Sequence, residues 1–231
     1  MLSTEIKDII SASKERGWVL EPEAKHLCSL AGLSVPRFVW ETGLEEAIGF
    51  ARKIGYPVVA KVVSPLMLHK SDMGGVVVDI ESDEKLSEVF HRFSQINGFA
   101  GILVEEMLSG VEMIAGAKVD YQFGPVILLG MGGTGVEIYR DVTMRMAPIG
   151  REDVMSMVRG LKAHQMLEGY RGSEPISLRD LTRTMVSFSD LLMELEGLIE
   201  SIDLNPLLCT ADRCVVADAR VILKVENAPD S

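Results

Sequence analysis

A histidine, two lysines and a glycine pair lie close together in the segment KVVSPLMLHKSDMGG, which runs from Lys61 to Gly75. A neutral imidazole such as that of His69 can attack phosphorus and carry a phosphoryl group. Lys61 is expected at the end of a buried strand, where a lysine can hold a phosphate as a point charge. The backbone of Gly74 and Gly75 can approach anionic oxygens closely. Each residue alone also fits an ordinary loop, so phosphoryl-group chemistry is a hypothesis for the segment as a whole.

A second group of polar residues is found in the motifs DLNP, from Asp203 to Pro206, and DAR, from Asp218 to Arg220. Residues two apart in a strand face the same side, so Asp203 and Asn205 should project together, and a returning strand can bring Asp218 beside them. Carboxylate and amide oxygens suit Mg²⁺, which usually takes one or two protein ligands plus water and phosphate oxygens. A turn that starts at Asn205 and Pro206 is the alternative interpretation.

The residues near the middle of the chain suggest a nucleotide. Glu105, Glu106 and Met107 end a predicted strand where two lobes should join, and their backbone groups could bind an adenine edge. The carboxylate of Glu112 could accept hydrogen bonds from ribose hydroxyls. A second glycine run, from Gly130 to Gly135, offers another loop for phosphate. Simple turns and surface charge also explain these features.

These residues need two lobes to position them. The pattern predicts an N-terminal helix within residues 1–20, a first lobe over 21–106 and a second over 107–231. The first lobe alternates strands and helices and is expected to be α/β, with strands at 35–40, 57–62, 76–80 and 101–106 and helices at 44–54 and 83–93.

The second lobe is expected to be α+β. Short strand-like runs predict an antiparallel meander over 112–120, 126–130, 136–139 and 143–147. Helices at 151–157, 161–169 and 178–194 then lead to a final pair of strands at 198–204 and 214–221.

Composition limits the functional classes. The chain has 231 residues, 47% of them hydrophobic, and a formal net charge of −11, so a nucleic-acid or anionic-membrane surface is not expected. An anionic ligand then requires local cations or a metal. The cysteines Cys28, Cys209 and Cys214 match no metal-ligand spacing and favour a reducing, cytoplasmic setting, and Cys209 and Cys214 should flank a hairpin. Neither a signal peptide nor a membrane-spanning stretch is apparent.

The motifs PVVAKV, LHKSDMGGV, VEEM, GMGGTGVEIYRDV, RMAP, IDLNPL and VADAR, taken in this order, resemble the ATP-grasp β subunit of ADP-forming acyl-CoA synthetases. This family is typified by the ADP-forming acetyl-CoA synthetases of archaea. The resemblance extends from about residue 20 to residue 224. It implies an ATP-grasp fold, with ATP or ADP and Mg²⁺ held between two lobes.

The resemblance also implies roles for the nucleotide-binding residues. Lys61 would contact the nucleotide phosphates, and Gly74 and Gly75 would form a flexible phosphate loop. Glu105 and Met107 would border the adenine.

The remaining site residues follow from the same resemblance. Glu112 would lie near the ribose, and Asn205 and Asp218 match the metal ligands of the family. His69 matches a loop histidine that carries the phosphoryl group, and Asp203 takes the place of an acidic residue near the phosphohistidine, where it would orient or stabilise the ring.

The implied reaction is acyl-CoA + ADP + phosphate ⇌ acid + ATP + CoA. A histidine of a separate α subunit would be phosphorylated first and would pass the group to His69, which delivers it to ADP. The expected α subunit carries the CoA-binding and ligase domains, in an α2β2 assembly. Two other hypotheses remain open: an ATP-grasp module of another synthetase-like protein, and a non-catalytic subunit that senses nucleotide or supports assembly.

Overall fold

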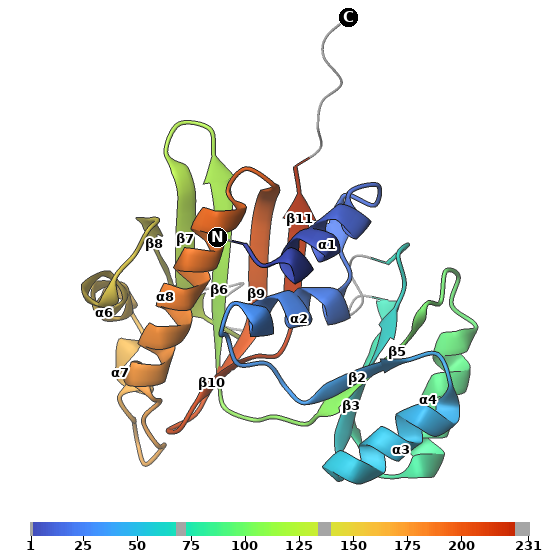
Figure 1. Cartoon of the computed structure of the whole chain (residues 1–231). Helices are drawn as coiled ribbons and strands as arrows, with labels where there is room; N and C mark the ends of the chain where they lie inside the picture. Colours follow the sequence, from blue (N-terminus) through green and yellow to red (C-terminus); the bar gives the residue numbers. More distant parts are fainter. Residues whose placement is uncertain (1, 68–72, 134–139, 225–231) are drawn as a thin grey trace, which may run out of the picture. The chain divides into compact units, whose positions relative to one another are not determined.

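The computed structural model describes residues 2–67, 73–133 and 140–224. The chain divides into two compact units (Figure 1). The smaller unit contains residues 36–108, and the larger contains residues 1–35 together with 109–231. Each unit is built around its own antiparallel sheet.

The smaller unit has a sheet in the order β2-β5-β3-β4. Its elements are β2 (Phe38–Glu41), α3 (Leu44–Ile54), β3 (Val58–Val63), β4 (Val76–Ile80), α4 (Asp83–Ser94) and β5 (Gly101–Glu106). All neighbouring strands are antiparallel, so the unit is α+β and the expected α/β class is wrong for this lobe. The reason is that β5 inserts between β2 and β3, so the strands that α3 connects are not neighbours.

Local signals explain where the helices of the smaller unit begin and end. The Ser82 side chain accepts a hydrogen bond from the Lys85 backbone N–H and caps α4. Gly55 follows α3 with a φ of +88°, a conformation that glycine adopts at little cost. The apolar faces of both helices cover one face of the sheet, where alternate residues of β3 and β5 form the core.

The larger unit has a sheet in the order β1-β11-β9-β6-β7-β8, with β10 paired to β9. Its strands are β1 (Trp18–Val19), β6 (Val111–Asp120), β7 (Gly124–Met131), β8 (Val142–Met146), β9 (Ile199–Cys209), β10 (Cys214–Val216) and β11 (Ala219–Leu223). Its helices are α1 (Thr4–Ser13), α2 (Glu21–Leu30), α6 (Arg151–Gly160), α7 (His164–Leu167) and α8 (Leu178–Leu195). The meander β6-β7-β8 is confirmed, whereas the predicted strand 136–139 lies outside the described residues.

The N-terminal segment belongs to the larger unit, which changes the expected boundary at residue 21. Strand β1 pairs with β11, with Trp18 opposite Ile222. Ile6 of α1 and Leu27 of α2 are buried in the core of the larger unit. The whole stretch 1–35 therefore packs with the C-terminal strands, and only residues 36–108 form the smaller unit.

The helices α1, α2 and α8 lie on the same side of the large sheet (Figure 1). Their buried side chains and those of alternate strand residues form one core cluster. The other face of the sheet, which we call the outer face, carries the intervening residues of β6, β9 and β11. In the described part of the chain, none of the helices has the length and apolar character needed to cross a bilayer.

Strand β9 is longer than predicted and contains a β-bulge. The register moves from Met113 opposite Leu207 to Ala115 opposite Leu204, so two steps along β6 match three steps along β9. The extra residue lies at Asn205 and Pro206, where the sequence suggested a turn. The predicted strand 214–221 is divided into β10 and β11, and the predicted helix 161–169 is reduced to α7.

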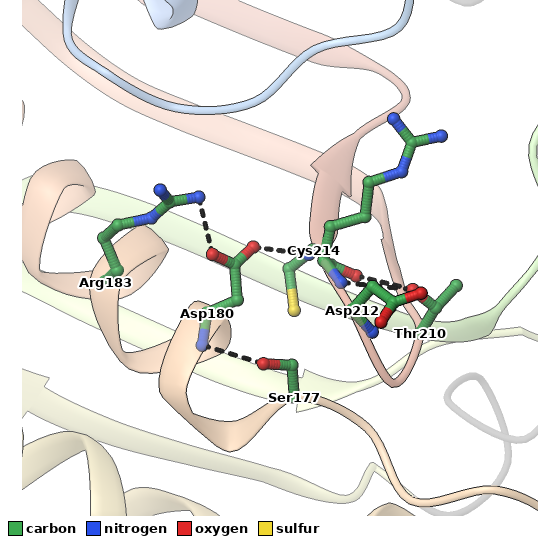
Figure 2. A network of polar contacts seen from close by, with 7 residues as sticks. Ser177, Asp180, Arg183, Thr210, Asp212 and Cys214 are labelled. Atoms are coloured by element: carbon green, nitrogen blue, oxygen red, sulfur yellow. Dashed lines mark hydrogen bonds and ion pairs between the residues drawn. The ribbon is translucent and has the colours of Figure 1, made fainter.

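The hairpin between β9 and β10 is tied to the first turn of α8 (Figure 2). Asp180 accepts a hydrogen bond from the Cys214 backbone N–H at 2.8 Å, and its other carboxylate oxygen pairs with Arg183. The backbone N–H of Ser177 donates to the Thr210 carbonyl at 2.7 Å. These contacts fix the end of β9 against the helix.

The three cysteines are buried and unbridged. Cys209 lies directly opposite Cys214 across the hairpin, as the sequence predicted. Burial raises the pKa of the Cys28 thiol to about 12, so this group behaves as a small apolar side chain.

The Asp180 contact predicts an asymmetric effect on stability. Replacing Asp180→Ala leaves the Cys214 N–H without its acceptor and should lower the free energy of unfolding by about 1–3 kcal/mol. Arg183 is 59% exposed, so Arg183→Ala should cost less than about 1 kcal/mol. Urea denaturation followed by circular dichroism measures both. Equal losses of unfolding free energy in the two variants would mean that the stabilisation comes from the surface ion pair with Arg183 and not from the hydrogen bond to the hairpin.

Candidate functional site

Lys61 and Glu105 form a buried ion pair in the smaller unit. The Lys61 Nζ lies 2.9 Å from the Glu105 Oε1, and the two side chains are only 7% and 4% exposed. Lys61 is opposite Leu103, and Val59 is opposite Glu105, so the charged residues are diagonal neighbours on one face of the sheet. This face points away from α3 and α4, because the alternate residues belong to the core that those helices cover.

The ion pair joins two residues that were expected to act on different parts of a nucleotide. A buried ammonium needs a partner to offset the loss of hydration, and Glu105 supplies one. The ammonium of a lysine has three N–H donors, so one bond to a carboxylate also fixes the direction of the others. Glu105 therefore positions the Lys61 side chain.

Gly74 and Gly75, at the end of the segment that follows β3, lie next to Lys61 in the sheet. The Val62 backbone N–H donates to the Gly75 carbonyl at 2.9 Å, and Val76 is opposite Lys61. Gly74 has a φ of +67°, and nothing lies within 4 Å of the place that a β-carbon would take. Lys61 and the two glycines thus lie at the same end of the β3–β4 hairpin. His69, the proposed carrier, falls within residues 68–72 and lies outside the described residues.

The end of β5 is fixed by Glu106. Its carboxylate accepts hydrogen bonds from the Arg37 backbone N–H at 3.1 Å and from the Arg37 Nε at 2.9 Å. The backbone immediately before the half-buried Met107 is therefore held in place. The alternation of the strand places the two glutamates in different surroundings, because Glu105 is buried on one face of the sheet and Glu106 pairs with Arg37 on the other.

On the outer face of the large sheet, Asp203 of β9 is directly opposite Arg220 of β11. The Arg220 Nη2 donates to the Asp203 Oδ2 at 3.2 Å. Partial burial raises the pKa of the Asp203 carboxyl, and Arg220 opposes that shift. The sequence identified Asp203 but did not identify Arg220 as its partner.

Asn205 and Asp218 are brought together as the sequence predicted. The Asn205 backbone N–H donates to the Asp218 carbonyl at 3.2 Å, and the next residues, Leu204 and Ala219, are register partners. The described residues contain no group of three or more His, Cys, Asp or Glu placed to hold a metal ion. The backbones of Asn205 and Asp218 thus meet at the bulge, and an amide and a carboxylate are side chains that suit a cation such as Mg²⁺, which takes its other ligands from water and phosphate.

Glu112 lies against the second glycine run. Its carbonyl accepts a hydrogen bond from the Gly132 backbone N–H at 2.7 Å, and a β-carbon at Gly132 would come within 2.7 Å of the Glu112 backbone. A β-carbon at Gly133 would lie 3.2 Å from the Glu112 Oε2. The glycines are therefore needed for this close approach. The rest of the run, from Thr134 onwards, lies outside the described residues.

A family model described as an ATP-grasp domain matches residues 11–223 of this chain. The chain is 41% identical over 226 residues to the β subunit of ADP-forming acetate–CoA ligase I of Pyrococcus furiosus, which covers 94% of this chain and 97% of that relative. It is 38% identical over 216 residues to the β subunit of ADP-forming acetate–CoA ligase II of the same organism, covering 89% and 92%.

The fold is similar to that of the dinucleotide forming acetyl-coenzyme A synthetase 1 of Ca. Korarchaeum cryptofilum, with a TM-score of 0.83 and 37% identity. The match covers 95% of this chain and 100% of that one. The solved structure is a complex with coenzyme A and Mg-AMPPCP, and its phosphohistidine segment points towards the nucleotide binding site.

The Lys61–Glu105 pair predicts that a double variant is more stable than a single one. Glu105→Ala leaves a buried ammonium uncompensated and should lower the free energy of unfolding by about 3–5 kcal/mol. The double variant Lys61→Met with Glu105→Leu should recover most of this loss. The fluorescence of Trp40 during urea denaturation, in a Trp18→Phe background, reports on the smaller unit. A double variant no more stable than Glu105→Ala would contradict the assignment.

Proposed function

This chain belongs to the ATP-grasp family of ADP-forming acetate–CoA ligase β subunits, and we propose that it is the nucleotide-handling subunit of an ADP-forming acyl-CoA synthetase. The proposed overall reaction is acyl-CoA + ADP + phosphate ⇌ acid + ATP + CoA. In each unit, the residues suited to phosphate or metal lie on the sheet face turned away from the helices or at the end of a strand. That arrangement supports assigning the function of the family to these residues of this chain.

The step proposed for this chain is a transfer of the phosphoryl group from nitrogen to oxygen. Phosphorylated His69 is attacked by a β-phosphate oxygen of ADP, the P–N bond breaks as the P–O bond forms, and the bonding electron pair stays on the imidazole nitrogen. In-line transfer of this kind depends on positioning and charge stabilisation, because little covalent chemistry is left to the protein.

The residues of the smaller unit would hold the phosphates. Lys61, aligned by Glu105, would donate to a phosphate oxygen, and the backbone N–H groups of Gly74 and Gly75 would approach the same group. The backbone from Glu105 to Met107, fixed beside the Glu106–Arg37 pair, would bind the adenine edge.

The residues of the larger unit would hold the metal and the ribose. Asn205 and Asp218 would bind Mg²⁺, which supplies positive charge to the transferring group when bound. Glu112 would accept hydrogen bonds from ribose hydroxyls. Asp203 would orient the ring of His69 during transfer.

A separate subunit completes the reaction in this proposal. Both P. furiosus relatives are named as β subunits, which supports a partner subunit that binds CoA and the acyl group and that phosphorylates its own histidine first. We propose an α2β2 assembly in the cytoplasm. The three unbridged thiols are in keeping with a reducing compartment.

The carrier role of His69 is tested by labelling. The complex of this chain with its partner subunit, given ATP labelled in the γ-phosphate and Mg²⁺, should acquire acid-labile phosphate on His69. The His69→Ala complex should acquire none on this chain and should make no ATP from acyl-CoA, ADP and phosphate.

His164 supplies the matched control. Its ring nitrogen lies 2.9 Å from the Leu161 carbonyl in the larger unit, so His164→Ala should label and turn over as the unsubstituted complex does. If the His69→Ala complex makes ATP at the normal rate, the carrier role is wrong, and a nucleotide-sensing or assembly role becomes the better account.

A further inference from the structure

Two of the three cysteines face each other at one end of the large sheet. Cys209, the last residue of β9, is the register partner of Cys214, the first residue of β10. Both side chains are fully buried and belong to the core of the larger unit. The third cysteine, Cys28, lies in α2. The pair is thus a buried dithiol at the closed end of a hairpin.

The hairpin places the two cysteines in the type of strand pair that a disulfide can bridge. The Thr210 backbone N–H donates to the Arg213 carbonyl at 2.8 Å, so Thr210 and Arg213 are a hydrogen-bonded pair. The next pair along an antiparallel ladder, here Cys209 and Cys214, is then a non-hydrogen-bonded pair, whose α-carbons are about 4.5 Å apart. A disulfide spans α-carbon separations of about 4.4–6.8 Å. The spacing of the backbone therefore permits a crosslink without rearrangement of the strands.

The two thiols are in contact but are poorly reactive in the closed hairpin. A hydrogen bond between the Cys209 and Cys214 side chains, together with burial and the nearby Asp180 carboxylate, raises the pKa of the Cys209 thiol. The thiolate is the form that attacks a disulfide, so a raised pKa slows the reaction. A reaction with a solute therefore requires the hairpin to open towards water.

Contacts with the first turn of α8 keep the hairpin closed (Figure 2). Asp180 accepts a hydrogen bond from the Cys214 backbone N–H at 2.8 Å, and the Ser177 backbone N–H donates to the Thr210 carbonyl at 2.7 Å. Beyond these two bonds, the turn over residues 211–213 is exposed. Loss of the bonds would let the turn move away from α8 and bring the thiols within reach of a solute.

We propose that Cys209 and Cys214 form a reversible disulfide across the β9–β10 hairpin in the presence of a low-molecular-weight disulfide, and that the hydrogen bond from the Cys214 N–H to Asp180 controls the rate. One cysteine thiolate attacks a sulfur of the small disulfide, and the first small thiol leaves as a mixed disulfide forms. The other cysteine attacks the protein sulfur of this mixed disulfide, and the second small thiol leaves. The two protein thiols lose two hydrogen atoms in all, and the small disulfide is reduced to two thiols.

The crosslink joins the two segments that bring the candidate metal ligands together. From the cysteines the ladder continues through Leu207, opposite Val216, to the Asn205 backbone N–H, which donates to the Asp218 carbonyl. A disulfide at the end of this ladder restricts its opening and limits the freedom of the unfolded chain, so the oxidised protein should be the more stable form. The crosslink goes beyond the proposed function, since neither its formation nor its reversal involves a nucleotide.

The test counts the free thiols of the full chain. The protein is incubated with oxidised glutathione, quenched with acid, unfolded and alkylated, and its mass is measured. It should carry one alkyl label in place of three, peptide mapping should place that label on Cys28, and dithiothreitol should restore the labels on Cys209 and Cys214. The oxidised protein should also melt about 2–6 °C higher than the reduced protein.

Variants of the contact with α8 test the control of the rate. Asp180→Ala removes the acceptor, so the hairpin should open more often and the disulfide should form about tenfold faster or more. Asp180→Asn keeps a side-chain carbonyl that can accept the same hydrogen bond, and its rate should stay within about threefold of the unsubstituted rate. Arg183→Ala removes only the exposed ion pair and should change the rate by less than about twofold.

The disulfide is ruled out if Cys209 and Cys214 keep their labels after an incubation that oxidises the thiols of the urea-unfolded chain, or if Cys28 loses its label as fast as they do. If Asp180→Asn reacts as fast as Asp180→Ala, the charge of the carboxylate and not the hydrogen bond sets the rate, and that part of the proposal is wrong. An oxidised protein that melts no higher than the reduced one contradicts the effect on the hairpin. Since no nucleotide is present, failure of the proposed function would leave all these readouts unchanged.

Discussion

The two-residue period of the β-strands is the constraint on which the candidate site depends. In β3, β6, β9 and β11, one set of alternate residues faces helices and is apolar, and the other set faces away and carries the charges. Lys61, Asp203 and Arg220 all belong to the second set. Because the core fixes the register of each strand, it also fixes which polar groups lie opposite one another. The bulge in β9 changes this alternation once, at Asn205, where the proposed metal ligands lie.

Charge is arranged locally in a chain whose formal net charge is −11. The cations best placed for chemistry are each paired with a carboxylate: Lys61 with Glu105 and Arg220 with Asp203. Such pairs orient a side chain more than they create a positive potential. Binding of a phosphate must therefore draw on backbone N–H groups and a divalent cation as well as on Lys61. This requirement is consistent with a glycine loop in one unit and two oxygen donors in the other.

The sequence predicted features that depend on local signals and missed those that depend on pairing between distant segments. The Ser82 cap, the glycine at the end of α3 and the hairpin flanked by Cys209 and Cys214 follow from a few neighbouring residues, and the structure contains them. The insertion of β5 between β2 and β3, which creates the Lys61–Glu105 pair, has no local signal. Neither has the pairing of β1 with β11, which joins opposite ends of the chain and moves residues 1–35 into the larger unit. The sequence at Asn205 and Pro206 suggested a turn because the bulge that these residues form has the same residue types as a turn. The role of His69 stays a prediction.

Calorimetric titration of ADP with and without Mg²⁺ shows whether this chain holds a nucleotide together with a divalent cation. Mg²⁺ should strengthen ADP binding by about tenfold or more, a gain of about 1.4 kcal/mol or more. In Asn205→Ala and Asp218→Ala that gain should disappear while binding without Mg²⁺ stays unchanged. If both variants keep the full effect of Mg²⁺, the metal is held elsewhere and the account of the site is wrong.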